Sequence, residues 1–176
     1  MADSAFAQAV GHYQQRLRRL GWEGAYVDVA VLHLTWLFLG EVEPAQAEAL
    51  AQELEQLREY PAAVWRVDEV GAFGPPMMPR VVWVGSRRAS KRLETLRDVV
   101  VRGMLRAGWA GEVPPWAPHV TLLRPRRRGE TALPAWSPQA VSIGEISLVH
   151  STLTPRGPIY RPLATVPLSR PGGEQS

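Results

Sequence analysis

Three amphipathic stripes at helical spacing, separated by short apolar runs, set the main limits on how this chain folds. In the first stripe, apolar residues recur every three or four positions over residues 6–20, which predicts a helix that ends near Gly21. The second stripe lies over residues 44–61 behind a proline, and the third over residues 90–108 between a serine N-cap and a glycine. We therefore expect three helices, each with one buried face.

The apolar runs between these stripes have the length and composition of strands. In chain order they cover residues 26–31, 33–39, 64–73, 80–84, 116–123, 143–149 and 159–166. The two halves of the chain have similar helix and strand content, which favours two lobes related by pseudo-symmetry. We expect residues 1–168 to form a single two-lobed domain, followed by a mobile tail over residues 169–176.

The size and composition of the chain fit one well-buried core. It has 176 residues, of which 45% are hydrophobic, and no cysteine, so disulfides and thiol nucleophiles are excluded. No apolar run approaches the roughly 20 residues that span a bilayer, and the N-terminus lacks the basic start and apolar core of a secretion signal. We expect a cytoplasmic, monomeric protein that does not bind membranes.

The sequence His-x-Thr occurs in both halves of the chain. We call His33-Leu34-Thr35 the first motif and His119-Val120-Thr121 the second motif. In an extended strand, residues two apart project from the same face about 7 Å apart, so each motif offers an imidazole beside a hydroxyl. A phosphate group fits between such side chains, and two motifs together suggest one active site with two histidines.

The three-residue pattern does not identify the site by itself. Thr supplies 7 of the 176 residues, so a given His is followed by Thr two positions later only about 4% of the time, yet three of the four histidines are. The third copy, His150-Ser151-Thr152, runs into a turn-like stretch, whereas the first two motifs lie in apolar runs that resemble buried strands. We therefore expect the first and second motifs to be functional and the third copy not. His12, on the first predicted helix, is expected to be a surface residue.

Metal chemistry is poorly supported by these histidines. His33 and His119 are 86 positions apart, and each is partnered by Thr rather than by a carboxylate or another His. We expect neither a metal nor a cofactor.

The positive charge of the chain is almost entirely arginine. There are 20 Lys and Arg residues, of which only Lys91 is lysine, and the net charge is +3. Arginine binds phosphate with paired hydrogen bonds, which is compatible with a polyanionic partner, although a codon bias towards arginine also explains the excess. The cluster Arg124–Arg128 directly follows the second motif. It is either a nucleic-acid contact or a solvated charged loop.

Beyond the tripeptides, the chain resembles the 2H phosphoesterase family, and within it the bacterial RNA 2′,3′-cyclic phosphodiesterases, also called LigT-like or 2′-5′ RNA ligase proteins. The run LHLTWLFLGEV over residues 32–42 resembles the family's first motif, and PHVTLLR over residues 118–124 resembles its second. The block over residues 148–160 resembles the family's last one, in which the position of His150 is not catalytic. The resemblance covers about residues 17–168.

This resemblance implies an α+β fold, with two pseudo-symmetric lobes of antiparallel sheet and flanking helices around a central cleft, and one His-x-Thr motif in each lobe. It implies His33 as general acid and His119 as general base. Thr35 and Thr121 would donate hydrogen bonds to the phosphate oxygens, and Arg124 would bind the same phosphate. The expected partner is RNA, or a nucleotide, with a 2′,3′-cyclic phosphate end.

The expected reaction is metal-independent hydrolysis of that end to a 2′-phosphate. Two alternatives use the same residues: an ATP-independent 2′-5′ RNA ligase, and a noncatalytic module that binds RNA ends. Family members usually begin with a short strand that can carry an aromatic residue stacked on the terminal base, and here residues 1–4 lead directly into a helix. Other aromatic residues lie in apolar runs and either stack on bases or belong to the core: Trp36, Trp83, Trp116 and Tyr160.

Overall fold

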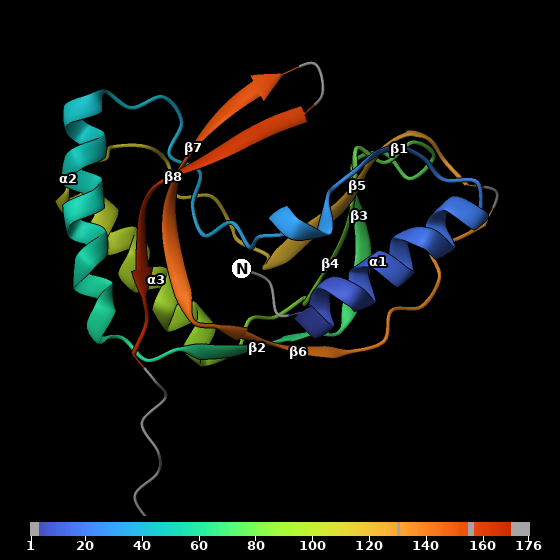
Figure 1. Ribbon diagram of the computed structural model, residues 1–176, viewed down its shortest axis with the longest axis horizontal. Coiled ribbons are helices and arrows are strands. Elements are labelled where there is room, and N and C mark those ends of the chain that lie inside the picture. The colour runs from blue at the N-terminus through green and yellow to red at the C-terminus, as the bar shows by residue number, and fades with distance from the viewer. Residues whose placement is uncertain (1–3, 130, 155–156, 170–176) are drawn as a thin grey trace, which may run out of the picture. The chain divides into compact units, whose positions relative to one another are not determined.

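The computed structural model describes residues 4–129, 131–154 and 157–169 (Figure 1). Its helices are α1 (Ser4–Arg19), α2 (Pro44–Glu55) and α3 (Lys91–Arg106), with 3₁₀ turns at Val29–Val31 and Gln56–Glu59. Its strands are β1 (Glu23–Tyr26), β2 (Ala63–Val67), β3 (Glu69–Phe73), β4 (Val81–Gly85), β5 (His119–Arg127), β6 (Gln139–Ile143), β7 (Glu145–Thr154) and β8 (Gly157–Pro167). The α+β class implied by the resemblance is confirmed.

The strands form one larger sheet and two pairs. The larger sheet has the strand order β1-β5-β4-β3, and all of its neighbouring strands are antiparallel. The pairs are β2 with β6 and the antiparallel hairpin of β7 with β8. Among the described residues, no helix combines the length and the apolarity needed to cross a bilayer.

The three predicted helices are confirmed, because local signals determine them. The side chain of Ser90 accepts a hydrogen bond from the backbone N–H of Leu93 and so caps α3 at its start. Gly108, with a φ of +87°, ends the same helix in a conformation that favours glycine. Pro44 occupies the first turn of α2, where its missing N–H is tolerated.

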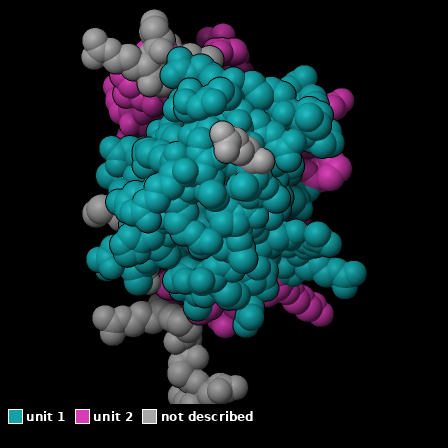
Figure 2. Space-filling view, turned by 90° about the vertical axis from the view of Figure 1, so that its right-hand side faces the viewer, with its two compact units in different colours: residues 1–35, 65–89, 116–141 teal, residues 36–64, 90–115, 142–176 magenta. Residues whose placement is uncertain are grey.

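The chain divides into two compact units (Figure 2). Unit 1 comprises residues 1–35, 65–89 and 116–141, and contains α1 and the four-stranded sheet. Unit 2 comprises residues 36–64, 90–115 and 142–176, and contains α2, α3 and the β7–β8 hairpin. Both the first and the second motif belong to unit 1, whose first segment ends at Thr35 of the first motif. The first motif stays with unit 1 because it follows the 3₁₀ turn that packs against α1.

The core of unit 1 lies between α1 and one face of the four-stranded sheet. Along α1, Val10 and Leu17 are completely buried. The buried side chain of Gln14 reaches β5 from the same helix face, and its amide N–H₂ donates to the carbonyls of Leu122, at 3.1 Å, and Val27, at 2.8 Å. This buried amide joins α1, the segment after β1, and the middle of β5.

The strands predicted over residues 26–31 and 33–39 are wrong. Residues 29–31 form a 3₁₀ turn, which Asp28 caps by accepting a hydrogen bond from the backbone N–H of Ala30. Residues 32–39 contain no strand. Their carbonyls instead accept hydrogen bonds from indole N–H groups, of Trp116 at Thr35 and of Trp109 at Leu39.

Two further expectations need correction. The single strand predicted over residues 64–73 is divided at Asp68 into β2 and β3, which belong to different sheets. The third copy is not in a turn: it lies in β7, where His150 pairs with Arg161 of β8. The pairing of β7 with β8 extends to Thr154 and Gly157, which confines the connection to residues 155–156, outside the described residues.

Ser169 is the only described residue of the predicted tail. Ser169 forms an isolated bridge with Pro61, and its backbone N–H donates to the carbonyl of Tyr60. Residues 170–176 lie outside the described residues, so the tail itself stays a prediction, as does the single domain over residues 1–168.

We predict that Gln14→Leu lowers the free energy of unfolding by about 1–3 kcal/mol, because the buried carbonyl of Leu122 and the part-buried carbonyl of Val27 lose their side-chain donor. Urea unfolding followed by circular dichroism measures this change as a lower midpoint. Gln8→Leu, at an exposed position of the same helix, is the matched control and should change the stability by less than about 0.5 kcal/mol. Equal midpoints for the two variants would show that the amide has no structural role.

Candidate active site

The second motif occupies the start of β5. His119 lies opposite Gly85 of β4, and Thr121 lies opposite Trp83. Val120, between them, is 3% exposed and faces the core of unit 1. Because side chains alternate along a strand, His119 and Thr121 project together from the other face, as the sequence predicted.

An irregularity in β5 determines which face Arg124 occupies. Val82 of β4 lies opposite Leu123, whereas the next residue of β4 lies opposite Thr121. The extra residue in β5, Leu122, forms a β-bulge. Leu122 and Leu123 are both completely buried, so their side chains share the core face. The alternation is shifted by one residue from there on, and the exposed Arg124 falls on the same face as Thr121.

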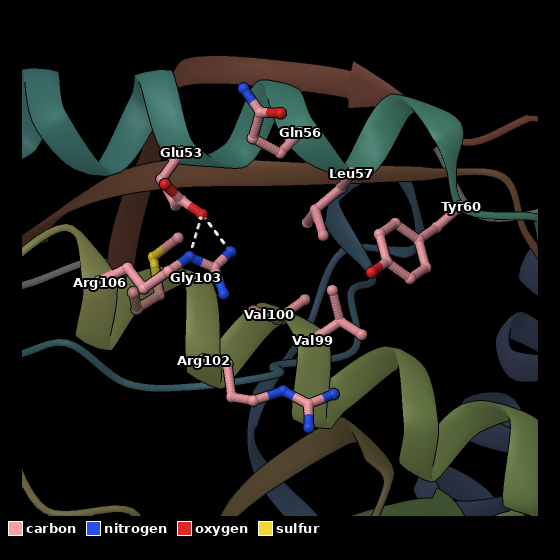
Figure 3. A pocket seen from close by; sticks show the side chains of 10 residues that line it. Glu53, Gln56, Leu57, Tyr60, Val99, Val100, Arg102, Gly103 and Arg106 are labelled. Atoms are coloured by element: carbon pink, nitrogen blue, oxygen red, sulfur yellow. Dashed lines mark hydrogen bonds and ion pairs between the residues drawn. The ribbon is translucent and has the colours of Figure 1, made fainter.

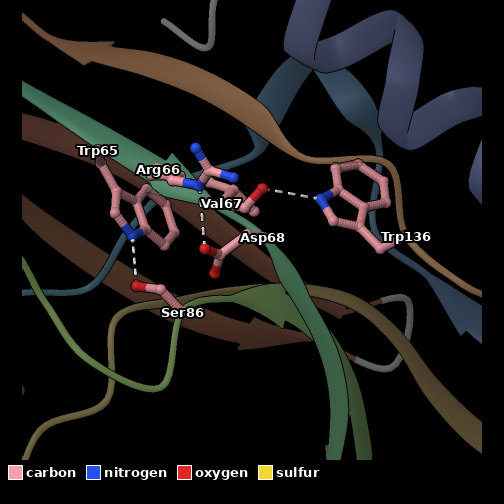
Figure 4. A network of polar contacts seen from close by, with 6 residues as sticks. All are labelled: Trp65, Arg66, Val67, Asp68, Ser86 and Trp136. Atoms are coloured by element: carbon pink, nitrogen blue, oxygen red, sulfur yellow. Dashed lines mark hydrogen bonds and ion pairs between the residues drawn. The ribbon is translucent and has the colours of Figure 1, made fainter.

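Close backbone packing supports the start of β5. A Cβ atom at Gly85 would lie 2.3 Å from the carbonyl oxygen of Pro118, so only glycine fits there. The backbone N–H of Ser86 donates to that same carbonyl. The Ser86 hydroxyl in turn accepts a hydrogen bond from the indole of the buried Trp65, at 2.9 Å (Figure 4). The backbone just before His119 is therefore anchored to β4 and β2.

Two aromatic side chains lie beside the imidazole of His119. The ring of Phe73 meets it edge to face, with centroids 4.9 Å apart and an angle of 86° between the planes. The indole of Trp83 lies 6.2 Å from the imidazole centroid and 5.2 Å from that of Phe73. Trp83 is 9% exposed and so belongs to the core, the first of its two predicted alternatives, while Phe73 is 39% exposed. Together they form an apolar wall on one side of His119.

The imidazoles of both motifs make the same backbone hydrogen bond. Nδ1 of His33 lies 2.9 Å from the carbonyl oxygen of Val31, and Nδ1 of His119 lies 2.8 Å from that of Ala117. In each case the acceptor is two residues earlier in the chain. A carbonyl oxygen carries no proton, so Nδ1 must be the donor in both rings. Proton exchange with a substrate is therefore assigned to Nε2.

The backbone of the first motif has a different structure from that of the second. It lies in an extended segment that belongs to no strand, with Leu32 buried and both His33 and Thr35 exposed. The indole N–H of Trp116 donates to the carbonyl of Thr35 at 2.9 Å. Because Trp116 stands three residues before His119, this hydrogen bond ties the segments that carry the two motifs to each other within unit 1.

Arg124 and Arg127 differ in their partners. Arg127 forms an ion pair with Glu23 of β1. Among the described residues, the guanidinium of Arg124 has no hydrogen bond or ion pair, and its side chain is exposed. Arg124 is thus available to an anionic ligand on the face that carries the second motif.

The remaining histidines lie away from these contacts. His12 is exposed on α1, as predicted, and His150 is exposed on β7 in unit 2. No group of three or more His, Asp or Glu side chains that could hold a metal ion occurs among the described residues.

Unit 2 contains a hollow of about 460 Å³ between α2 and α3 (Figure 3). Glu53 of α2 and Arg106 of α3 form an ion pair across it. None of the motif residues lines this hollow, and we assign no catalytic role to it.

Several neighbours of the second motif were not found from the sequence. Gly85 and Phe73 are separated from His119 by more than 30 positions, and only the pairing of β3 with β4 and of β4 with β5 brings them beside it. Trp116 was considered only as a core or base-stacking residue, and its hydrogen bond to the first motif was not expected. No local pattern indicates these contacts, because each joins residues that are far apart in the sequence.

Comparisons with known proteins all indicate one family. Residues 2–83 match the family model described as LigT like Phosphoesterase. An RNA 2′,3′-cyclic phosphodiesterase of Aeropyrum pernix is 33% identical over 80% of this chain and 84% of the relative. An RNA 2′,3′-cyclic phosphodiesterase of Thermotoga maritima is 30% identical over 85% of this chain and 82% of the relative. The crystal structure of Escherichia coli LigT complexed with 3′-AMP superimposes with a TM-score of 0.76 and 26% identity, covering 97% of this chain and 95% of that one.

We predict that the neutral imidazoles of His33 and His119 both carry their proton on Nδ1, because a backbone carbonyl accepts it there. Nitrogen-15 NMR of labelled protein distinguishes the two tautomers directly. His12, which is exposed, serves as the internal control and should show the Nε2–H form that free imidazole prefers. An Nε2–H tautomer at His119 would contradict the assignment.

Proposed function

The chain belongs to the LigT-like phosphoesterase family, and on this premise we propose that it is an RNA 2′,3′-cyclic phosphodiesterase that opens a terminal cyclic phosphate to a 2′-phosphate. The relatives with 30% identity or more carry that name. The observation that supports the proposal best is the matched pair of imidazoles, in which Nδ1 of each ring is bound to the carbonyl two residues earlier in the chain.

In the proposed reaction, a water molecule attacks phosphorus while the bond from phosphorus to the ribose 3′ oxygen breaks. His119 accepts a proton from the water at Nε2, and His33 donates its Nε2 proton to the departing 3′ oxygen. The products are a 2′-phosphate and a free 3′ hydroxyl, so each turnover leaves His119 protonated and His33 neutral until the solvent restores them. Each proton transfer typically contributes about 10²–10⁴ in rate.

The other motif residues act on the charge of the phosphate. Thr35 and Thr121 donate hydroxyl hydrogen bonds to the two nonbridging oxygens. Arg124, which the bulge in β5 brings to the same face as Thr121, neutralises the charge that grows on those oxygens as the water attacks. The backbone hydrogen bonds at Nδ1 hold the imidazoles in position before the substrate arrives, so little reorganisation is needed.

We predict that the protein hydrolyses a nucleoside 2′,3′-cyclic phosphate in the presence of a chelator, with a bell-shaped dependence of the rate on pH. His33→Ala and His119→Ala should each lower kcat by at least about 10², because each removes one proton transfer. Chromatography of the 2′- and 3′-phosphate products measures both the rate and the position of cleavage.

His150→Ala is the matched control, since it removes an exposed histidine of the same tripeptide pattern from β7. Its activity should equal that of the unmodified protein. Loss of activity in this variant, with activity retained in His119→Ala, would show that the motifs are paired wrongly. Tight binding of the cyclic phosphate without any turnover would favour a noncatalytic RNA-end-binding module instead.

We predict that Arg124→Ala raises KM for the cyclic phosphate and lowers kcat/KM by about tenfold to a hundredfold, the usual loss when a charge-assisted hydrogen bond is removed. Arg127→Ala should have a much smaller effect, because Arg127 already binds Glu23. Initial-rate kinetics on both variants provides the comparison. Equal effects would mean that phosphate is attracted by a diffuse basic patch rather than by one arginine.

A further inference from the structure

Positive charge is concentrated in the unit that carries both motifs. Unit 1 has 11 arginines and 6 acidic residues in its sequence, a net charge of +5, whereas unit 2 has 9 basic and 11 acidic residues, a net charge of −2. A single terminal phosphate uses only Arg124. The remaining arginines of unit 1 take no part in the proposed reaction.

Part of this charge is neutralised by ion pairs. Arg66, Arg87 and Arg127 each contact a carboxylate within unit 1. Among the described residues, Arg18 and Arg126 have no such carboxylate partner, and both are exposed.

Arg18 and Arg126 line a shallow hollow of about 610 Å³ in unit 1. The other residues that line it are Trp22, Glu23, Gly24 and Tyr26. The hollow begins next to Arg124, because a Cβ atom at Gly24 would lie 2.3 Å from the Arg124 carbonyl oxygen and 2.9 Å from the backbone nitrogen of Arg126. β1 and β5 pack this closely only because residue 24 is a glycine.

The guanidinium of Arg18 lies against an aromatic ring. It lies over the ring of Tyr26, 3.9 Å from the ring centroid. A guanidinium stacked on an aromatic face keeps its N–H donors in its own plane, directed away from the ring. Because stacking already restricts Arg18, less conformational entropy is lost when it binds an anion.

The carboxylate of Glu23 does not neutralise the positive charge of Arg18 and Arg126. Glu23 accepts a hydrogen bond from Arg127, and that bond, together with the charges of Arg127 and Arg126, holds the pKa of the Glu23 carboxyl below its ordinary value. The negative charge of Glu23 is thus balanced by the positive charge of Arg127. Arg18 and Arg126 remain as two positive charges without a carboxylate of their own.

We propose that this hollow binds the sugar–phosphate backbone of the RNA strand on the 5′ side of the terminal cyclic phosphate, with Arg18 and Arg126 holding an internal phosphate. The proposal rests on the proposed function. Arg126 is five residues beyond Thr121, about 17 Å along β5 at the usual rise of a strand. A few nucleotides of extended single strand span this distance, so the hollow serves oligonucleotides and not mononucleotides.

A strand fits the hollow better than a free anion does. Both arginines are exposed, and salt screens a single small ion at such a site, which would bind only weakly. An internal phosphate of a strand whose end is already held at the motifs is present at a high effective concentration, so the same two contacts increase its affinity considerably. Binding through phosphates carries no sequence preference.

The first experiment compares KM for a nucleoside 2′,3′-cyclic phosphate with KM for a tetranucleotide that ends in the same group. We expect KM of the unmodified protein to be about tenfold lower for the tetranucleotide. In Arg18→Ala/Arg126→Ala, the ratio of the two KM values should fall to nearly one. Arg66→Ala removes the same charge from β2 of the same unit and should leave the ratio unchanged.

A second experiment leaves the protein intact and changes the substrate. Replacing the internal phosphates of the tetranucleotide with uncharged methylphosphonates should abolish the tenfold gain. In the charged tetranucleotide, log(kcat/KM) should fall with log[salt], and each arginine removed should reduce that slope by about 0.7, as expected for contacts to single strands. Arg126→Gln repeats this test in a variant that keeps the Arg18 stacking.

The outcomes separate this inference from the proposed function. If the protein does not hydrolyse the mononucleoside substrate, the proposed function is wrong. If it hydrolyses both substrates with equal KM, or if the gain survives in the Arg18 and Arg126 variants or with methylphosphonates, the hollow does not bind the strand while the catalytic assignment stands.

Discussion

The pairing of β4 with β5 is the interaction on which the rest of unit 1 depends. It requires a glycine at position 85, because a side chain there would collide with the carbonyl of Pro118. It also includes the bulge at Leu122, which allows two successive leucines to reach the core. The core face is thereby filled by Leu122 and Leu123, and Arg124 is left on the face of the second motif. A regular strand would have directed the arginine five positions after the histidine into the core.

The two motifs reach the same imidazole arrangement from different backbones. His119 is in a strand and His33 is in an irregular segment, yet each donates from Nδ1 to the carbonyl two residues before it. This hydrogen bond needs only an extended backbone. In a strand, the hydrogen bonds to the neighbouring strands stabilise that backbone, and in an isolated segment other contacts do so. For the first motif, the indole of Trp116 is one of those contacts. The tripeptide pattern therefore reflects an imidazole geometry more than a type of secondary structure.

Elements that local interactions determine could be predicted from the sequence. Elements that depend on contacts with residues far away in the chain could not. The helices follow from caps and apolar stripes, and Ser90 and Gly108 lie where the pattern placed them. The apolar run after His33 has the composition of a strand, but its carbonyls are bound by indoles 70 and 81 residues away, which no local pattern indicates. The third copy was dismissed because it resembled a turn, although pairing with β8 makes it a strand. Its exclusion stays a prediction that rests on the family resemblance.

The arginine cluster after the second motif is resolved into separate roles by the structure of β5. A second shift in register, between Glu23 and Gly24 of β1, leaves one extra residue in β5, because Glu23 lies opposite Arg127 whereas Gly24 lies opposite Pro125. That shift places Arg127 against Glu23 and leaves Arg126 beside the hollow. Adjacent arginines of one strand thus differ in what they can bind. Composition alone could not separate a solvated loop from a phosphate-binding surface, because the distinction depends on two single-residue irregularities in the pairing of three strands.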